Sequence, residues 1–421
     1  MRIIQICPYD LNRPGGVRSH IFGLSQSLVE AGHEVIIIGP DSSVFKGSDT
    51  KKSSTNAIER DREASKELIQ SDIVNDHDIL KTDHHPINTG DNSFGGKLKF
   101  IKIGYRRSAI PLWGTQIDFS VANSREKSSM LDFFQDWNPD VAHFHTPWTP
   151  FLSMQIYRLL KKLKNAGNRP PRFIATFHDS PPDTWFGSVL GNFVMPLAAK
   201  FMLPKFDEVI SVSEFQSQFI SKWSSKKVHI IPNGIRLDEG GERVSWEPSK
   251  TILFLGRLEA RKGLIHLLQA YKILKTRIPE VNLIVAGEGP QRREGELFSQ
   301  LHQLEVDFRG MVSEEEKNRL LLSAGVFVSP ALFGESFGIV LVEAMAKGVP
   351  VAGYGNPGYL SVVAGVCEEN FPSPGDVAAL ANVIDKVLTN PDYAQELSKK
   401  GLIHAQTFDW DLISKRILKL Y

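Results

Sequence analysis

Two glutamates bracket an apolar run in the segment GESFGIVLVEA, residues 334–344. An ordinary buried strand would not need a carboxylate at each end. Glu335 can accept hydrogen bonds from the hydroxyl groups of a sugar. Glu343, about two helical turns further along, can reach the two vicinal hydroxyls of a ribose. The alternative is a capped helix with one surface glutamate, but it leaves unexplained why apolar residues surround Glu343.

The same segment predicts a phosphate-binding helix start. We expect the helix to begin at about residues 336–337 and to run to Lys347, because Gly348 is a typical C-terminal stop. The first turn of a helix has uncapped N–H groups and the positive end of the helix dipole, and both favour phosphate. The residues expected to form this diphosphate cradle are Ser336, Phe337, Gly338, Ile339 and Val340.

Two cations follow a predicted strand in FLGRLEARKG, residues 254–263. Arg257 and Lys262 would neutralise a leaving diphosphate from the carboxyl end of that strand. The alternative is a solvated basic loop, which is what most Lys and Arg residues form. With two fixed cations in place a divalent metal is unnecessary, and we expect neither an Asp-x-Asp metal site nor a metal cofactor.

Glycines elsewhere in the sequence predict that the backbone approaches the nucleotide closely. In PGGV, residues 14–17, Gly15 and Gly16 leave room for the backbone to approach phosphate or sugar, although a plain tight turn is the alternative. The segment GEGPQRR at 287–293 lacks the third glycine of a dinucleotide fingerprint, because Arg292 stands there, so nicotinamide binding is disfavoured. The base of the nucleotide is expected near Gly287, Gly289, Arg309 and Gly310.

Alternating strands and helices must position these residues. Residues 3–6 and 33–40 read as strands on either side of a glycine-rich turn, 8–16, and an amphipathic helix, 19–32, which together form a βαβ unit. Ligands bind at the carboxyl ends of such strands. Further strands with carboxyl-end loops are expected within 140–145, 173–179, 207–213, 228–235, 251–263, 281–290, 306–312, 325–336 and 349–358. The pattern restarts at residue 251, so we place a domain boundary in the polar stretch 236–250.

Composition limits the protein class. The chain has 421 residues, of which 42% are hydrophobic, so two domains are expected. Its 49 Lys and Arg residues and 48 Asp and Glu residues nearly cancel, which disfavours nucleic-acid binding. Cys7 and Cys367 suit free thiols in the cytosol. Neither the N-terminus nor residues 189–204 predict an export signal or a membrane span.

Residues 42–98 interrupt the alternation and are rich in Ser, Asp, Lys and Asn. We expect a long, partly mobile insertion, because too few apolar side chains are present to offset the entropy of ordering. A solvated loop explains the following acidic and histidine residues better than a metal site, because their spacing matches no ligand pattern: Asp76, His77, Asp78, His84 and His85.

The chain resembles the retaining glycosyltransferases of family 4. Among them, its sequence motifs are most similar to those of the phosphatidylinositol mannosyltransferases. The two glutamates separated by seven residues match that family's hallmark. Other matching segments occur in order along nearly the whole chain: PGGVRSH (14–20), ATFHD (175–179), SVSEF (211–215), IPNGI (231–235), FLGRLEARKG (254–263) and GEGP (287–290).

This resemblance implies an α/β fold of GT-B architecture, with two facing Rossmann-like domains and a deep cleft between them. Residues 1–240 would bind the acceptor and 241–405 the nucleotide sugar, while a helix at about 406–421 would pack back on the first domain. The resemblance also places His178 beside the transferred sugar, as an orienting or charge-stabilising group. Front-face transfer, in which the departing phosphate oxygen takes the acceptor's proton, is the favoured scheme.

The donor implied is a nucleotide diphosphate sugar, with GDP-mannose ahead of UDP-glucose. A lipid-linked acceptor at the inner face of the membrane is suggested by the basic helix 157–172, by Arg106 and Arg107, and by the aromatic stretch 185–206. Solvated and core roles for these segments remain open, and the nearly neutral segment 123–134 puts an inositol phospholipid in doubt. The alternatives are a soluble sugar or sugar-phosphate acceptor with a UDP-sugar donor, a nucleotide-sugar epimerase on the same fold, and a non-catalytic binding protein.

Overall fold

The computed structural model describes residues 1–9, 15–40, 73–74, 98–103, 105–112, 115–147, 150–178, 199–237 and 248–421. The insertion predicted at 42–98 lies outside the described residues except at 73–74 and 98. The side chains of Arg106 and Arg107, and residues 179–198 of the aromatic stretch, also lie outside this description.

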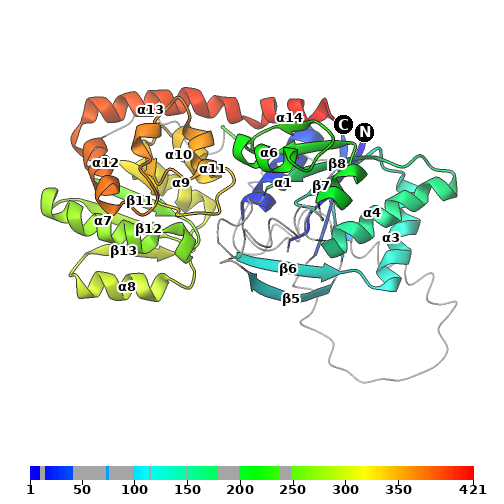
Figure 1. The fold of residues 1–421 in the computed structure, drawn as a ribbon, viewed down its shortest axis with the longest axis horizontal. Coiled ribbons are helices and arrows are strands. Elements are labelled where there is room, and N and C mark those ends of the chain that lie inside the picture. The colour runs from blue at the N-terminus through cyan, green and yellow to red at the C-terminus, as the bar shows by residue number, and fades with distance from the viewer. Residues whose placement is uncertain are drawn as a thin grey trace, which may run out of the picture.

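The first domain is built on a sheet of order β10-β9-β8-β7-β1-β2-β4-β3, in which only the short β3 is antiparallel to its neighbour. A separate antiparallel hairpin, β5–β6, accompanies it (Figure 1). The strands are β1 Arg2–Ile6, β2 Glu34–Gly39, β3 Ile73–Val74, β4 Leu98–Lys102, β5 Tyr105–Leu112, β6 Thr115–Val121, β7 Val141–His145, β8 Arg172–Phe177, β9 Glu208–Ser211 and β10 Val228–Ile230.

Alternate residues of the central strands face two different cores. Ile4 and Ile6 of β1 pack in the cluster that includes α3 and α4, whereas Ile3 packs in the cluster with α1 and α14. Gln5 shares the parity of Ile3 and therefore faces the α1 and α14 side. The helices of this domain are α1 Gly16–Glu30, α3 Ser124–Trp137, α4 Pro150–Lys162 and α6 Glu214–Ser221, with the 3₁₀ turns η2 Leu163–Ala166 and η3 Leu203–Lys205.

The second domain has an all-parallel sheet of order β13-β12-β11-β14-β15. Its strands are β11 Thr251–Leu255, β12 Asn282–Ala286, β13 Val306–Gly310, β14 Val326–Ser329 and β15 Val351–Gly353. The elements that follow them are η4 Ala260–Lys262, α7 Leu264–Arg277, α8 Arg292–Leu301, α9 Glu314–Ser323, α10 Ile339–Ala346, α11 Pro357–Val363, η5 Glu368–Asn370, α12 Val377–Thr389, α13 Pro391–Ala405 and η6 Gln406–Phe408. The predicted pair of parallel-sheet α/β domains is therefore confirmed.

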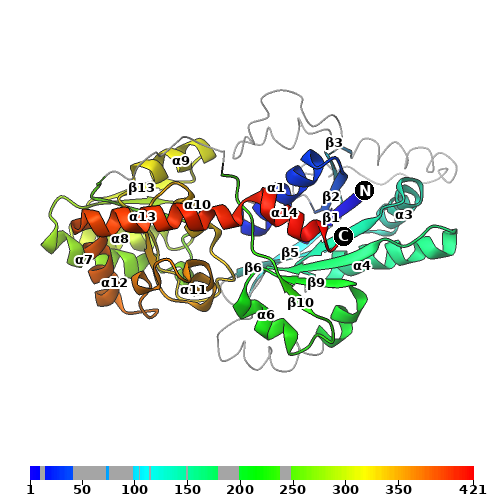
Figure 2. The ribbon, with the colours of Figure 1, turned by 90° about the horizontal axis from the view of Figure 1, so that it is seen from above.

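The chain returns to the first domain through its last helix, α14 Trp410–Leu418. Figure 2 shows α13 lying along the second domain and α14 along the first. Ile235 forms an isolated bridge with Asp409, and Trp410 is buried in the first domain's core. The indole packs so closely on Gly23 of α1 that a Cβ there would lie 2.2 Å from its Nε1.

Two helix starts differ from the sequence prediction. Helix α1 begins at Gly16 rather than at residue 19, so Gly16 lies in the first turn and not in a loop. Helix α10 begins at Ile339 rather than at 336–337, because Gly338 adopts φ +91° before it. Gly338 cannot carry a side chain there, since a Cβ would lie 2.6 Å from the Tyr359 ring.

Both cysteines, Cys7 and Cys367, are free and buried, as the sequence indicated. Among the described residues, no helix has both the length and the apolar character that crossing a membrane requires.

Candidate active site

The strand order of the second sheet reverses between β11 and β14. Loops that leave the carboxyl ends of two such strands lie side by side, and in open parallel sheets this is where ligands bind. The backbones touch, since the Leu332 N–H donates to the Arg261 carbonyl at 2.8 Å. Gly263 has φ +74°, and a Cβ there would lie 2.0 Å from the Pro330 carbonyl oxygen, so glycine is required for this approach.

A charge cluster joins these two loops. Glu335 Oε1 accepts from Lys262 Nζ at 2.7 Å and from Arg261 Nη1 at 2.6 Å. Glu259 pairs with Arg261 Nε and with Arg257 Nη1, each at 2.9 Å. Three cations thus meet two carboxylates, which leaves one positive charge in excess at the reversal point. The structure therefore brings Arg257, Lys262 and Glu335 into one cluster, and it adds Arg261, which the sequence prediction missed.

Burial and charge oppose each other at the centre of this cluster. Burial raises the pKa of Glu335, but the Lys262 and Arg261 charges and their hydrogen bonds outweigh it, so the pKa lies below its ordinary value. Burial lowers the pKa of Lys262, and the Glu335 carboxylate does not fully compensate, because the charges of Arg261 and Arg257 lower the pKa again. An added anion between the loops would relieve this crowding of cations.

The predicted diphosphate cradle is split between a loop and a helix. Ser336, Phe337 and Gly338 belong to the loop that leads from Glu335, whereas Ile339 and Val340 form the first turn of α10. Within the part of the chain that the structure describes, no side chain caps the start of α10. The positive end of the α10 dipole therefore begins four residues after Glu335, next to the charge cluster in the chain.

Glu343 is held by another helix. Its Oε1 lies 3.2 Å from Lys317 Nζ of α9, and the same Nζ lies 2.6 Å from Glu314 Oε2. Burial lowers the pKa of Lys317, but these two carboxylates outweigh it and raise the pKa well above its ordinary value. The surroundings of the Glu343 carboxylate are therefore ionic rather than purely apolar, and Lys317 is a further residue that sequence reasoning missed.

The glycines after β12 pack against the loop after β11. Gly287 has φ +139°, and a Cβ there would lie 1.9 Å from the Gly256 carbonyl oxygen. Gly289 has φ +157°, and its Cβ would lie 2.6 Å from the Leu258 carbonyl oxygen. Both glycines are thus explained by contact between neighbouring loops, whether or not a nucleotide also approaches them.

The predicted base-binding residues of β13 lie at the sheet edge beyond β12. Arg309 is about half exposed and pairs with Asp307 at 2.7 Å and with Glu316 at 3.7 Å. Gly310 has φ +68° and faces the side chains of Glu288 and Arg292. These residues belong to the same sheet as β11, which precedes Arg257, but among the described residues no hydrogen bond or ion pair joins Arg309 to the charge cluster.

In the first domain, Gly15 and Gly16 mark the start of α1. A Cβ at either glycine would meet nothing within 4 Å among the described residues. Open space at this point is compatible with the predicted approach of a ligand to the backbone.

His178 follows β8 and is 7% exposed. Its Nε2 lies 3.0 Å from His145 Nδ1, and His145 Nε2 lies 2.7 Å from Gln5 Oε1. An amide oxygen only accepts, so His145 carries its proton on Nε2 and accepts on Nδ1 from His178. Gln5 thus orients His178 through His145.

A second chain of hydrogen bonds leads from Gln5 to His143. Gln5 Nε2 donates to the Tyr421 hydroxyl at 3.0 Å, and that hydroxyl lies 2.6 Å from His143 Nδ1. His143 Nε2 in turn lies 2.7 Å from Thr176 Oγ1. Sequence reasoning did not select His143 or His145, although their i, i+2 spacing on a predicted strand was a signal that both face the same side.

The buried histidines are neutral. Burial, followed by the charge of neighbouring imidazoles, holds the pKa values of His143 and His145 well below the ordinary 6.5. The pKa of His178 is lowered well below 6.5 for the same reasons, and burial lowers the pKa of His20 to about 3. A base with such a low pKa accepts protons poorly at neutral pH.

Comparison with known proteins follows the two-domain division. Residues 93–239 match the profile described as Glycosyltransferase Family 4. Residues 242–403 match the profile described as Glycosyl transferases group 1.

Two relatives that align with the whole chain have the same name. The chain is 29% identical to the phosphatidyl-myo-inositol mannosyltransferase of Mycolicibacterium smegmatis, over 100% of this chain and 93% of that protein. It is 28% identical to the protein of the same name from Propionibacterium freudenreichii, over 100% and 94%.

Solved structures resemble the whole chain in fold. Sucrose-phosphate synthase from Thermosynechococcus elongatus aligns with a TM-score of 0.69 at 21% identity, covering 100% of this chain and 98% of that one. The Anabaena protein HepE, in complex with UDP and glucose, aligns with a TM-score of 0.66 at 15% identity, covering 100% and 99%.

Proposed function

The chain belongs to the glycosyltransferases and has the GT-B architecture, and from this premise we propose that it transfers a hexose from a nucleotide diphosphate sugar to a lipid-linked acceptor. Mannose from GDP-mannose is the first choice, with glucose next. The full-length similarity to proteins named as mannosyltransferases supports this order. The anomeric configuration of the sugar is retained, and the reaction takes place at the cytoplasmic face of the membrane.

The main observation in support of the proposal is the charge cluster at the point where the strand order of the second sheet reverses. Arg257, Arg261 and Lys262 exceed Glu259 and Glu335 by one positive charge. A departing nucleoside diphosphate gains negative charge as the glycosidic bond breaks. Fixed cations and the uncapped start of α10 stabilise that charge without reorganising, so the transition state gains more than the ground state.

The two glutamates have different proposed roles. Glu335, held between two cations, accepts hydrogen bonds from the hydroxyls of the hexose. Glu343, positioned by Lys317, accepts from the ribose hydroxyls. Both roles use carboxylates that take part in ion pairs, and carboxylate oxygens accept hydrogen bonds from hydroxyl groups.

His178 is proposed to orient the reacting centre rather than to act as a general base. Its pKa well below 6.5 supports this choice, because a strongly depressed pKa weakens a base at neutral pH. The departing phosphate oxygen then takes the acceptor's proton, and no metal ion is required for the transfer.

The experiment is a donor and acceptor screen. The purified protein is incubated with GDP-mannose or UDP-glucose, each with a membrane lipid extract, with a soluble sugar panel, or without acceptor. We expect sugar from GDP-mannose to appear in the lipid fraction, and nuclear magnetic resonance of the product to show the donor's anomeric configuration.

Other outcomes of this screen decide between the alternatives. Label in the soluble fraction would favour a soluble acceptor, and an epimer formed without acceptor would favour an epimerase. Nucleotide-sugar binding without turnover under any condition would overturn the proposed transferase activity.

A further inference from the structure

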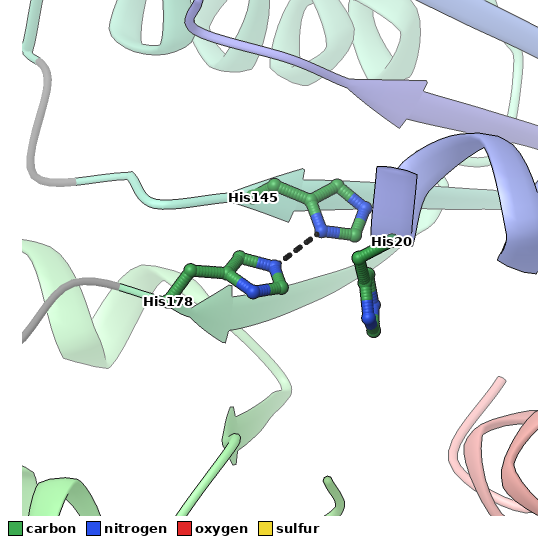
Figure 3. Close-up of side chains that lie close together, drawn as sticks. All are labelled: His20, His145 and His178. Atoms are coloured by element: carbon green, nitrogen blue, oxygen red, sulfur yellow. Dashed lines mark hydrogen bonds between the residues drawn. The ribbon is translucent and has the colours of Figure 1, made fainter. Parts of the chain in front are cut away.

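Three buried imidazoles from three different elements converge in the first domain. His20 comes from α1, His145 ends β7 and His178 follows β8 (Figure 3). One ring nitrogen from each lies within 4.8 Å of the other two. His145 and His178 already lie 3.0 Å apart, nitrogen to nitrogen.

The third imidazole has unexplained polar atoms. His20 is 1% exposed, and neither of its nitrogens makes a hydrogen bond of good geometry to any residue that the structure describes. The Asn233 side chain lies close enough to interact with both His20 and His178, yet its Oδ1 also makes no hydrogen bond of good geometry among the described residues. Buried polar atoms are normally satisfied, so this arrangement points to a missing ligand.

The hydrogen bond between His145 and Gln5 fixes the tautomer of His145, and therefore which of its nitrogens can bind a metal ion. Gln5 Oε1 accepts from His145 Nε2, so the lone pair of His145 is on Nδ1, the atom that faces His178. Metal-bound histidines are usually oriented in this way, by a hydrogen bond from the nitrogen that does not bind the metal. Gln5 therefore pre-orients one of the three imidazoles for a cation.

We propose that His20, His145 and His178 form a binding site for a divalent transition-metal cation of the Zn²⁺ type. Three ligands at about 2.0–2.1 Å around a tetrahedral Zn²⁺ lie about 3.3 Å from one another. The pair His145 and His178 is close to this separation, and His20 must rotate inward to complete it. The fourth position is left for water or for the Asn233 oxygen.

The ligand chemistry selects the class of cation. The three ligand atoms are imidazole nitrogens, and no carboxylate belongs to the cluster within the described part of the chain. Nitrogen ligands suit Zn²⁺ and its neighbours in the first transition row, whereas Mg²⁺ and Ca²⁺ require oxygen. Binding requires the His178 proton to move from Nε2 to Nδ1, which leaves the imidazole neutral and releases no proton.

The site has a consequence that rests on the proposed function. If His178 orients the reacting centre, a cation on its Nε2 removes the hydrogen bond to His145 and fixes the ring in a new position. Zn²⁺ thus inhibits the transfer, and a chelator restores it.

Binding is tested with Co²⁺ alone on tag-free protein treated with a chelator. We expect the visible absorption of tetrahedral Co²⁺ to saturate at one equivalent and to disappear when Zn²⁺ is added. His20→Gln and His145→Gln should abolish the signal, whereas His266→Gln should keep it, because the half-buried His266 lies in α7 of the other domain. Circular dichroism and melting temperature establish that each variant folds. A further variant, Gln5→Leu, retains all three histidines and should bind Co²⁺ more weakly.

Two results would overturn the site: no Co²⁺ absorption with the wild-type protein, or absorption of equal strength in folded His20→Gln. Transfer activity is then measured with Zn²⁺ and after chelation. Unimpaired transfer by protein that carries one equivalent of Zn²⁺ refutes the inhibition only. Absence of transfer with every donor counts against the proposed function, while the Co²⁺ spectrum still decides whether the site exists.

Discussion

Replacing Arg261 by methionine tests whether this buried cation of the charge cluster stabilises the fold. The exposed cation Arg257, which a ligand can reach, provides the comparison. The Arg261 side chain is 7% exposed, and it bonds Glu335 at 2.6 Å and Glu259 at 2.9 Å. Arg261→Met removes both charge-assisted hydrogen bonds but retains most of the apolar volume. Breaking one partner out of a buried ionic network costs about 3–5 kcal/mol.

The structure places the expected loss at the lower end of that range. Glu335 keeps Lys262 at 2.7 Å, and Glu259 keeps Arg257 at 2.9 Å, so neither carboxylate is left without a cation. We therefore expect Arg261→Met to lower the free energy of unfolding by about 3 kcal/mol. Urea unfolding followed by circular dichroism measures the difference in the free energy of unfolding between the variant and the wild type, if both have the same m value.

Arg257→Met is the matched control. The Arg257 side chain is 53% exposed and, among the described residues, forms an ion pair with Glu259 alone, so its loss should cost no more than about 1 kcal/mol. Its proposed contact with the diphosphate predicts weaker binding of a nucleoside diphosphate by isothermal titration calorimetry. The reasoning is refuted if both variants lose the same stability, or if Arg261→Met loses less than Arg257→Met.

Three further predictions address other parts of the structure. Lys262→Ala should weaken nucleoside diphosphate binding more than nucleoside monophosphate binding in calorimetry; equal losses would show that Lys262 does not reach the distal phosphate. The pKa of Glu335 is lower in the folded protein than in the unfolded chain, so the unfolded chain binds a proton at this carboxylate more readily. The free energy of unfolding should therefore fall as the pH drops below about 4.5. Glu335→Gln should reduce that acid sensitivity in urea titrations, and an unchanged pH profile would contradict the assignment. Gly23→Ala should cost about 1–3 kcal/mol, because its Cβ would overlap the Trp410 ring, whereas a Cβ at Gly16 meets nothing within 4 Å among the described residues, so Gly16→Ala should melt like the wild type; equal melting temperatures would disprove the tight packing of α14.

Local patterns in the sequence sufficed to predict many of the strands and the charged loops that follow them. Mainly apolar runs such as residues 3–6 and 251–255 predicted buried strands, and the structure contains them as β1 and β11. The loop positions of Lys262 and Glu335 followed directly, because each comes shortly after such a run. Helix starts were less accurate, since the left-handed Gly338 before α10 is required by contact with Tyr359, which lies on another element.

Which side chains meet could not be read from the sequence, because these contacts join residues far apart in the chain. Arg261 and Glu335 are 74 positions apart, and Lys317 and Glu343 are 26 apart. Their pairing depends on how the loops after β11 and β14, and the helices α9 and α10, pack together. The sequence showed three basic residues in one loop but not which of them would be buried.

The sequence alone determined that this chain folds as two α/β domains and that its charged loops follow the strands, because apolar runs and glycines act on their immediate neighbours. Only the tertiary structure decided that Arg261 is the buried cation on Glu335 and that Lys317 holds Glu343. It also brought His145 and His178, which are 33 positions apart, together with His20 of α1. The physical reason is that burial and electrostatic pairing depend on distances in space, which arise only when separate elements pack against one another.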